Sequence, residues 1–185
     1  MGRYDDATII VSADHGEGFG EHGFYLHAHH FWEEVIRVPL IIKGKKFPTM
    51  VDPRLTQSID VPTTIAALAG ASTEGMMGHS LLEEPKKGSY AISEYNEFGI
   101  HRQAIVDARY KVIWQRPADE KWFDKAVKSR KYFPSVSFGK EVVRVFDLVN
   151  DPKEAVDLSG DPPPRAKQLL QILRDFVTKA PAKGV

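Results

Sequence analysis

A short apolar strand that ends on an acid and an imidazole most constrains how this chain can fold. Residues 7–13, Ala-Thr-Ile-Ile-Val-Ser-Ala, are mostly apolar and rich in β-branched side chains, which is typical of a strand covered on both faces. Asp14, His15 and Gly16 follow directly. Ligands of open α/β sheets bind where the strands end, so we expect Asp14 and His15 to lie in a site.

Histidines gather in the segment that follows this strand. Five of the seven histidines lie between positions 15 and 30: His15, His22, His27, His29 and His30. Interleaved glycines allow the loop to approach a ligand closely. A lone Asp-His pair is more often a hydrogen-bonded turn, but this concentration of histidines favours a functional site. His22, His29 and His30 fit equally well as solvated loop residues and as partners that orient ligands.

Asp14 and His15 carry the donor atoms of a divalent-cation site. A carboxylate oxygen suits calcium, magnesium or manganese, and an imidazole nitrogen shifts the preference toward manganese or zinc. Two ligands do not complete such a site. The others must come from His27, His29 or His30, or from residues outside this chain.

The rest of the chain predicts a mixed α/β protein in two units. Residues 31–36 read as a short helix, with Arg37 paired to an acid one turn earlier, and residues 38–42 read as a second buried strand. Residues 60–70 read as a helix on which Val61, Ile65, Leu68 and Ala69 share a face. Residues 83–88 are charged and rich in helix breakers, so we expect one unit over residues 1–84 and a second over residues 89–185.

The second unit is expected to be a small antiparallel sheet packed by one C-terminal helix. Its strand-like segments are residues 90–94, 103–106, 110–114 and 142–148, and the tight connection at 107–109 predicts a hairpin. Leu169, Ile172, Leu173 and Phe176 recur at helical spacing between Asp161 and Pro181. The basic segment 121–140 has scattered charges of both signs and reads as solvated surface.

Charge and composition exclude several classes of function. Twenty-five basic and 25 acidic residues give a formal net charge of zero, so no global field draws nucleic acid or a membrane surface. No cysteine is present, which excludes disulfides, thiolate metal sites and a cysteine nucleophile. No apolar run approaches the ~20 residues of a membrane span, and the first residues lack a signal-peptide core. The sequence therefore does not indicate the cellular compartment of the protein.

These motifs resemble the sulfatase family of the alkaline-phosphatase-like superfamily. Residues 5–23 and 27–42 are similar, in order, to its signature of a strand, D-H-G-E, G-E-H-G, and an aromatic residue followed by E-E-x-I-R-V-P-L-I-I. Further similarities are residues 60–70 to its D-x-x-P-T helix, residues 78–82 to its G-x-S-L element, and residues 110–113 and 146–152 to strands of its C-terminal sheet.

The resemblance implies a fold and roles for particular residues. The fold would be an alkaline-phosphatase-like α/β sheet fragment followed by the small antiparallel sheet and its helix. Asp14 and His15 would be the C-terminal pair of ligands to an active-site divalent cation, usually Ca²⁺, with Mn²⁺, Mg²⁺ or Zn²⁺ as alternatives. His27 would be the catalytic contact that stabilises the negative oxygens of the sulfate or phosphate group, with His29 as the reserve position for substrate binding.

The sequence departs from the family in lacking its nucleophile. Family members carry an N-terminal paired-aspartate metal site and a C/S-x-P-x-R motif whose cysteine or serine becomes formylglycine. Neither a cysteine nor a Ser-x-Pro-x-Arg run is present. We therefore expect the C-terminal part of a metal-dependent sulfatase, inactive alone. A fragment of a related phosphodiester or phosphonate monoester hydrolase, and a non-catalytic anion- or partner-binding protein, are the alternatives.

The expected ligand is a sulfate-ester or phosphoester small molecule or glycan, with no nucleic acid and no membrane. Strand 7–13 would lack several sheet neighbours if the N-terminal half were missing. Because an exposed β-branched edge invites pairing, self-association through the exposed core is expected. Intact family members are often exported, and nothing in this sequence fixes the compartment.

Overall fold

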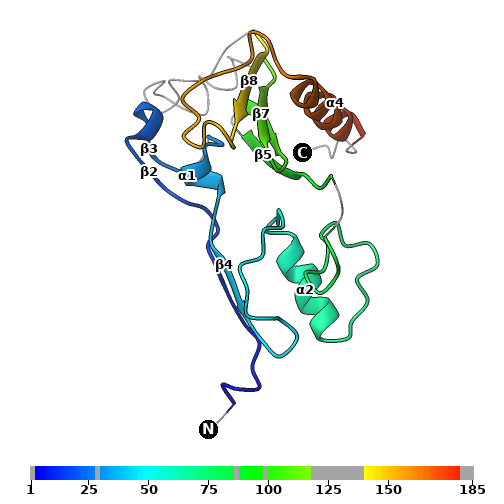
Figure 1. Ribbon diagram of the computed structural model, residues 1–185. Coiled ribbons are helices and arrows are strands. Elements are labelled where there is room, and N and C mark those ends of the chain that lie inside the picture. The colour runs from blue at the N-terminus through cyan, green and yellow to red at the C-terminus, as the bar shows by residue number, and fades with distance from the viewer. Residues whose placement is uncertain (1–2, 28–29, 86–87, 98–99, 118–139, 180–185) are drawn as a thin grey trace.

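A computed structural model describes residues 3–27, 30–85, 88–97, 100–117 and 140–179. The chain forms two lobes (Figure 1). The first contains the strands at residues 9–12 and 40–43 and the helix at residues 60–68, and the second contains the antiparallel sheet, the C-terminal helix and the short elements at residues 18–26 and 33–36. His29 and residues 121–139 of the basic segment lie outside the described part. Within that part, no helix is long and apolar enough to cross a membrane.

The apolar run forms β1 (Ile9–Ser12), which pairs with β4 (Leu40–Lys43) in an antiparallel ladder. The register places Ile9 opposite Lys43 and Ser12 opposite Leu40. The expected strand is present, but the expected burial on both faces is not, because Val11 and Ile41 are 52% and 63% exposed. In the described residues β1 has β4 as its single sheet neighbour, so the ladder stays partly solvated.

Helix α2 (Asp60–Leu68) confirms the predicted helix, and the face that it buries is polar. Asp60, Thr63 and Thr64 are buried, whereas Ile65 is 51% exposed. The Thr64 hydroxyl donates to the Asp60 carbonyl (2.7 Å) and accepts from the Leu81 amide (2.9 Å). Hydrogen bonds therefore hold the residues around Leu81 against α2. The hydrophobic periodicity of the sequence does not predict this contact.

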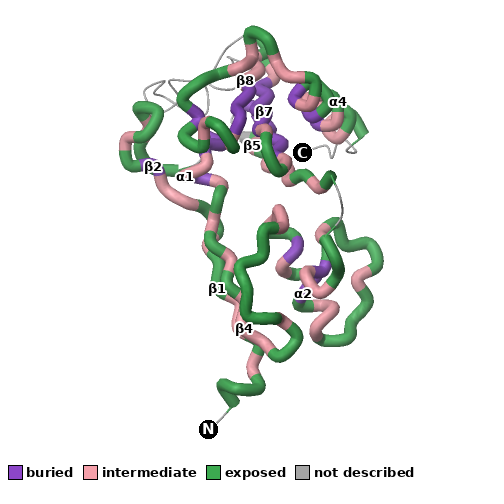
Figure 2. The backbone as a smooth tube through the Cα atoms, in the orientation of Figure 1, coloured by how far each residue is buried: buried purple, intermediate pink, exposed green. Residues whose placement is uncertain are grey.

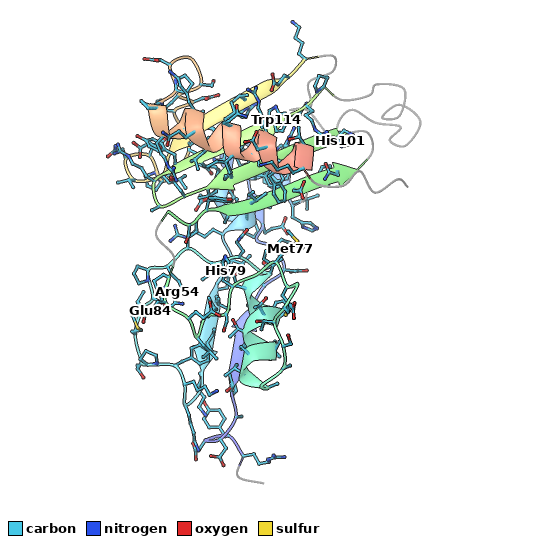
Figure 3. All side chains as sticks on the ribbon, turned by 90° about the vertical axis from the view of Figure 1, so that its right-hand side faces the viewer. Arg54, Met77, His79, Glu84, His101 and Trp114 are labelled. Carbon is cyan, nitrogen blue, oxygen red and sulfur yellow. The ribbon has the colours of Figure 1, made fainter. Side chains whose placement is uncertain are left out.

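The second lobe contains a four-stranded antiparallel sheet in the order β5-β6-β7-β8. Its strands are β5 (Ala91–Glu97), β6 (Ile100–Val106), β7 (Tyr110–Gln115) and β8 (Val142–Asp147). Helix α4 (Pro164–Lys179) packs on one face, where Leu169 and Leu173 are wholly buried against Ile105, Val112 and Val145. Trp114 lies on this helix-covered side (Figure 3). The predicted sheet, hairpin and helix are confirmed.

The opposite face of this sheet is covered by a segment from the first predicted unit. Phe31 and Trp32, directly before α1 (Glu33–Ile36), are buried against Ala104, Ile113 and Phe146. The buried residues of the chain concentrate around this sheet (Figure 2). The predicted boundary at residues 83–88 stays a prediction, and residues of the first predicted unit pack on the sheet of the second.

The two lobes meet around a cavity of about 240 Å³. Arg54, His79 and Glu84 lie in this junction (Figure 3). The Arg54 guanidinium donates to the carbonyls of Leu81 (3.1 Å) and Glu83 (2.8 Å). Arg54 thus holds the residue 81–83 loop in place at the junction.

Candidate active site

The loop after β1 forms a short hairpin that brings the His27 side chain into contact with that of His15. Strands β2 (Gly18–Phe19) and β3 (Tyr25–Leu26) pair antiparallel, and a 3₁₀ turn, η1 (Glu21–Gly23), joins them. The hairpin brings the His15 and His27 rings into a stack, with centroids 4.0 Å apart and planes inclined by 23°. Two histidines that are distant in sequence therefore share one face of the loop.

Gly16 fixes the start of this loop against α1. Its amide donates to the Val35 carbonyl at 2.7 Å. A Cβ atom at this position would lie only 2.0 Å from the Glu34 carbonyl oxygen, so the contact requires glycine. The direction in which Asp14 and His15 leave the strand is thus tied to the position of α1.

His15 presents one ring nitrogen as a lone-pair donor. Its Nδ1 lies 2.7 Å from the Gly16 carbonyl oxygen, which can only accept, so Nδ1 carries the proton. Nε2 then holds the lone pair, and it lies 3.8 Å from Asp14 Oδ2. An imidazole nitrogen and a carboxylate oxygen are side by side.

The Asp14 carboxylate is exposed and its charged form is favoured. Its side chain is 89% exposed, and its Oδ1 accepts the His15 amide at 3.0 Å. That hydrogen bond is the largest cause holding the pKa of Asp14 below its usual value, followed by the residue's own amide and by the charge that His15 carries when its ring is protonated. Asp14 is therefore anionic at neutral pH, as a metal ligand must be.

Glu17 is a member of the site that the sequence did not single out. One of its carboxylate oxygens lies 3.0 Å from His27 Nδ1. The other oxygen is buried and has no hydrogen-bond partner among the described residues. One ligand atom from each of His15, Glu17 and His27 lies within 4.8 Å of the others. The only sequence signal was an acid in the D-H-G-E run, and the hairpin that brings it to His27 is not readable from spacing.

The other loop histidines lie elsewhere. The His22 ring stacks on Trp32 with centroids 3.9 Å apart, and its Nε2 is 3.6 Å from Glu34 Oε1. His30 is buried, with its ring centroid 4.0 Å from that of Phe24. The structure thus joins His27, and neither of these, to the Asp14 and His15 pair.

A buried ion-pair network positions α1, and sequence reasoning missed it. The Lys111 side chain is wholly buried, and its Nζ lies 2.7 Å from Glu33 Oε1 and 2.8 Å from Glu154 Oε1. It also donates to the Phe31 carbonyl at 2.8 Å. The predicted pair between Arg37 and Glu33 is present as well, at 3.7 Å on the surface.

Glu154 completes the network from the loop after β8. Its Oε2 accepts the Glu33 amide at 2.8 Å, which caps the first turn of α1. Burial raises the pKa of Glu154, and the neighbouring Lys111 ammonium acts in the opposite direction. The histidine-rich loop therefore rests on a helix that the C-terminal sheet holds by charge-assisted hydrogen bonds.

Comparison with known proteins relates this chain to sulfatases and to the alkaline phosphatase superfamily. The sulfatase family model matches residues 1–71. A multifunctional alkaline phosphatase superfamily protein, PehA of Trinickia caryophylli, is 30% identical over 186 residues, covering 97% of this chain and 34% of that protein. A choline-sulfatase of Rhizobium meliloti is 39% identical over 158 residues, covering 85% of this chain and 28% of that protein. The chain spans about a third of the length of these curated relatives.

Solved structures share the fold. A protein in complex with its substrate, D-glucosamine-2-N,6-O-disulfate, has a TM-score of 0.67 and 21% identity over 96% of this chain and 35% of that one. The phosphonate monoester hydrolase of Agrobacterium radiobacter has a TM-score of 0.64 and 18% identity over the same shares. At these identities the likeness concerns the fold alone.

Proposed function

Because this chain belongs to the sulfatase family, we propose that it forms the C-terminal part of a metal-dependent sulfuric ester hydrolase. The observation that carries the proposal is the pairing at the end of β1. There an anionic Asp14 oxygen and the lone-pair nitrogen of His15 lie 3.8 Å apart. Such a pair supplies two adjacent positions of a cation's coordination shell.

The proposed cofactor is a divalent cation held by Asp14 Oδ2 and His15 Nε2. By family resemblance it is Ca²⁺, and the imidazole nitrogen keeps Mn²⁺, Mg²⁺ and Zn²⁺ as candidates. When bound, a divalent cation polarises the ester and stabilises the negative charge that develops during its cleavage. The carbonyl of Gly16 keeps His15 in the tautomer that such a ligand requires.

His27 is proposed to contact the anionic group of the substrate. Glu17 accepts from Nδ1, which leaves Nε2 as the nitrogen that can donate to a sulfate oxygen when the ring is protonated. The stack on His15 places this ring beside the proposed metal ligand. A positive imidazolium there would stabilise negative oxygens in the transition state. His29 remains the reserve position for substrate contact.

The proposed substrate is a sulfate ester of a small molecule or glycan. The choline-sulfatase relative and the solved neighbour with its disulfated glucosamine support this class. Phosphonate or phosphodiester hydrolysis is the second candidate, since a phosphonate monoester hydrolase is among the solved structures of the same fold. A non-catalytic anion-binding member is the third.

Metal binding by this chain tests the proposal directly. Titration calorimetry with Ca²⁺ and Mn²⁺ should give binding that disappears in the double variant Asp14→Ala, His15→Ala. It should persist in Asp175→Ala, which removes an exposed carboxylate from α4. Equal heats from the double variant and the unaltered chain would refute the assignment.

Catalysis requires a nucleophile that this sequence lacks, so the chain alone should not turn over an aryl sulfate or a phenyl phosphonate. Hydrolysis that Asp14→Ala abolishes would contradict this. A C-x-P-x-R motif encoded upstream in the same reading frame would favour a sulfatase over a binding protein.

The exposed Val11 and Ile41 on the β1-β4 ladder also support the proposed self-association, which light scattering would test.

A further inference from the structure

Glu17 joins His15 and His27 in a group of metal-ligating side chains that differs from the proposed pair of Asp14 and His15. Glu17 directly precedes β2 and His27 directly follows β3, so the hairpin brings them together. One ligand atom of each of the three side chains lies within 4.8 Å of the others. Two imidazoles and one carboxylate therefore converge on a single point.

The contact between Glu17 and His27 has nearly the separation of two ligands on one metal ion. His27 Nδ1 lies 3.0 Å from Glu17 Oε2. Zinc binds nitrogen and oxygen at about 2.0–2.2 Å, so two ligand atoms of a tetrahedral zinc ion lie about 3.4 Å apart. A zinc ion can thus replace the proton that these two atoms share, and that proton passes to the solvent.

The second oxygen of Glu17 adds to the capacity of this group for a cation. Glu17 Oε1 is buried and has no hydrogen-bond partner among the described residues. A buried carboxylate oxygen without a partner is unfavourable, because it has lost its water and gained nothing in exchange. A cation bound by the carboxylate would offset that cost.

His15 supplies the third ligand. The Gly16 carbonyl accepts from its Nδ1, which leaves Nε2 to bind a metal ion, and its ring stacks on that of His27 with centroids 4.0 Å apart. The side chains of His15, Glu17 and His27 are each about one third to one half exposed. They therefore have room for the small movement that closes 4.8 Å to about 3.4 Å.

We propose that His15, Glu17 and His27 form a binding site for Zn²⁺, and that zinc bound there withdraws His15 from the pair that it forms with Asp14. Two histidines and one glutamate are an established set of zinc ligands, and they leave the fourth position to water. Zinc binding does not depend on the proposed function. The competition for His15 rests on it, because it requires a cation held by Asp14 and His15.

Zinc titration of the whole chain tests the site, with calorimetry for the affinity and long-range ¹H-¹⁵N spectra of the histidine rings for the ligands. We expect one Zn²⁺ per chain. The ring nitrogens of His15 and His27 should shift with zinc, and those of His79 and His101, which lie outside the group, should not. No saturable binding, or shifts that leave His15 and His27 unchanged, would overturn the proposal.

Glu17→Gln is the decisive variant. Loss of a residue that only supports a metal ligand costs about 10–100-fold in affinity, so loss of a ligand should weaken zinc binding at least about tenfold. His27→Ala should do the same. Glu74→Gln and His79→Ala remove an exposed carboxylate and an exposed imidazole and should stay within about twofold of the unaltered chain. Unchanged zinc affinity in Glu17→Gln would refute the site.

Asp14→Asn separates this site from the proposed cation site. It should weaken zinc binding less than Glu17→Gln does, and the reverse order would place zinc on Asp14 and His15 and overturn the proposal. Zinc-loaded chain should no longer bind Ca²⁺, and Ca²⁺ binding that zinc does not diminish would refute the competition for His15. Chain that binds Zn²⁺ but never Ca²⁺ would instead refute the proposed Ca²⁺ cofactor and leave the zinc site standing.

Discussion

Lys111 Nζ, on β7, lies 2.7 Å from Glu33 Oε1, on α1. This ion pair joins the C-terminal sheet to the helix that supports the histidine-rich loop. Glu33 begins α1, and the Val35 carbonyl of that helix holds the Gly16 amide. The orientation of Asp14 and His15 therefore depends on a sheet that contributes no residue to their pairing. The C-terminal lobe has a direct structural role in the candidate site.

Replacing Lys111 by Met should destabilise the fold strongly. The substitution keeps most of the side-chain length and removes the charge, so the carboxylates of Glu33 and Glu154 lose their buried partner. Breaking one side of a buried pair costs about 3–5 kcal/mol. Urea unfolding followed by circular dichroism would measure the loss.

A matched lysine provides the control for this variant. Lys45 pairs with Asp6 where both side chains are more than 70% exposed. Lys45→Met should change the free energy of unfolding by no more than about 0.5 kcal/mol. Similar effects of the two substitutions would contradict the proposed role of Lys111.

The Arg109–Asp147 pair predicts a loss of stability in acid. Arg109 donates to both carboxylate oxygens of Asp147, and this is the largest cause that lowers the pKa of Asp147 from 3.8 to about 2. A carboxyl group whose pKa is lower in the folded state stabilises the fold above its unfolded pKa. That stabilisation should disappear as the pH falls from about 4 to about 2.

The variant Asp147→Asn tests whether this ion pair causes the expected loss of stability in acid. The variant should be less stable at pH 7 and should lose less stability than the unaltered chain between pH 4 and pH 2. Unfolding midpoints in urea across this range would measure both curves. Parallel curves would show that Asp147 does not contribute to the acid transition.

Glu17→Gln should change which ring nitrogen of His27 carries the proton. In the present geometry the Glu17 carboxylate accepts from His27 Nδ1 at 3.0 Å and favours that tautomer. An amide can turn either its oxygen or its nitrogen toward the ring, so the preference should weaken. Long-range ¹H-¹⁵N spectra of the histidine rings would record this, with the His15 pattern unchanged because Gly16 determines it.

Local patterns predicted much of the fold, and long-range contacts set the parts that were missed. β-Branched runs and a hairpin turn located β6 and β7, because these signals lie within the strands themselves. The buried polar face of α2 was not predicted, because Thr64 accepts a hydrogen bond from the Leu81 amide, in a loop seventeen residues on. Lys111 and Glu154 were missed for the same reason, since their partner Glu33 comes from a distant segment.

The same distinction applies to the candidate site. Asp14, His15 and His27 were named from the strand end and from family resemblance, and the structure places the three close together. Glu17 was not named, because its approach to His27 depends on the β2-β3 hairpin. Two-residue strands carry too little periodicity to be recognised in sequence.

The Gly16→Ala substitution adds only one methyl group, but we expect it to disturb the candidate site strongly. The added Cβ would lie 2.0 Å from the Glu34 carbonyl oxygen, so either the loop or α1 must shift. We expect a loss of about 1–3 kcal/mol in the free energy of unfolding, as for overpacking, and weaker cation binding by Asp14 and His15. Gly160→Ala is the control, since no atom lies within 4 Å of its added Cβ. If Gly16→Ala binds Ca²⁺ and unfolds like the control, the contact between the loop and α1 does not position the proposed metal ligands.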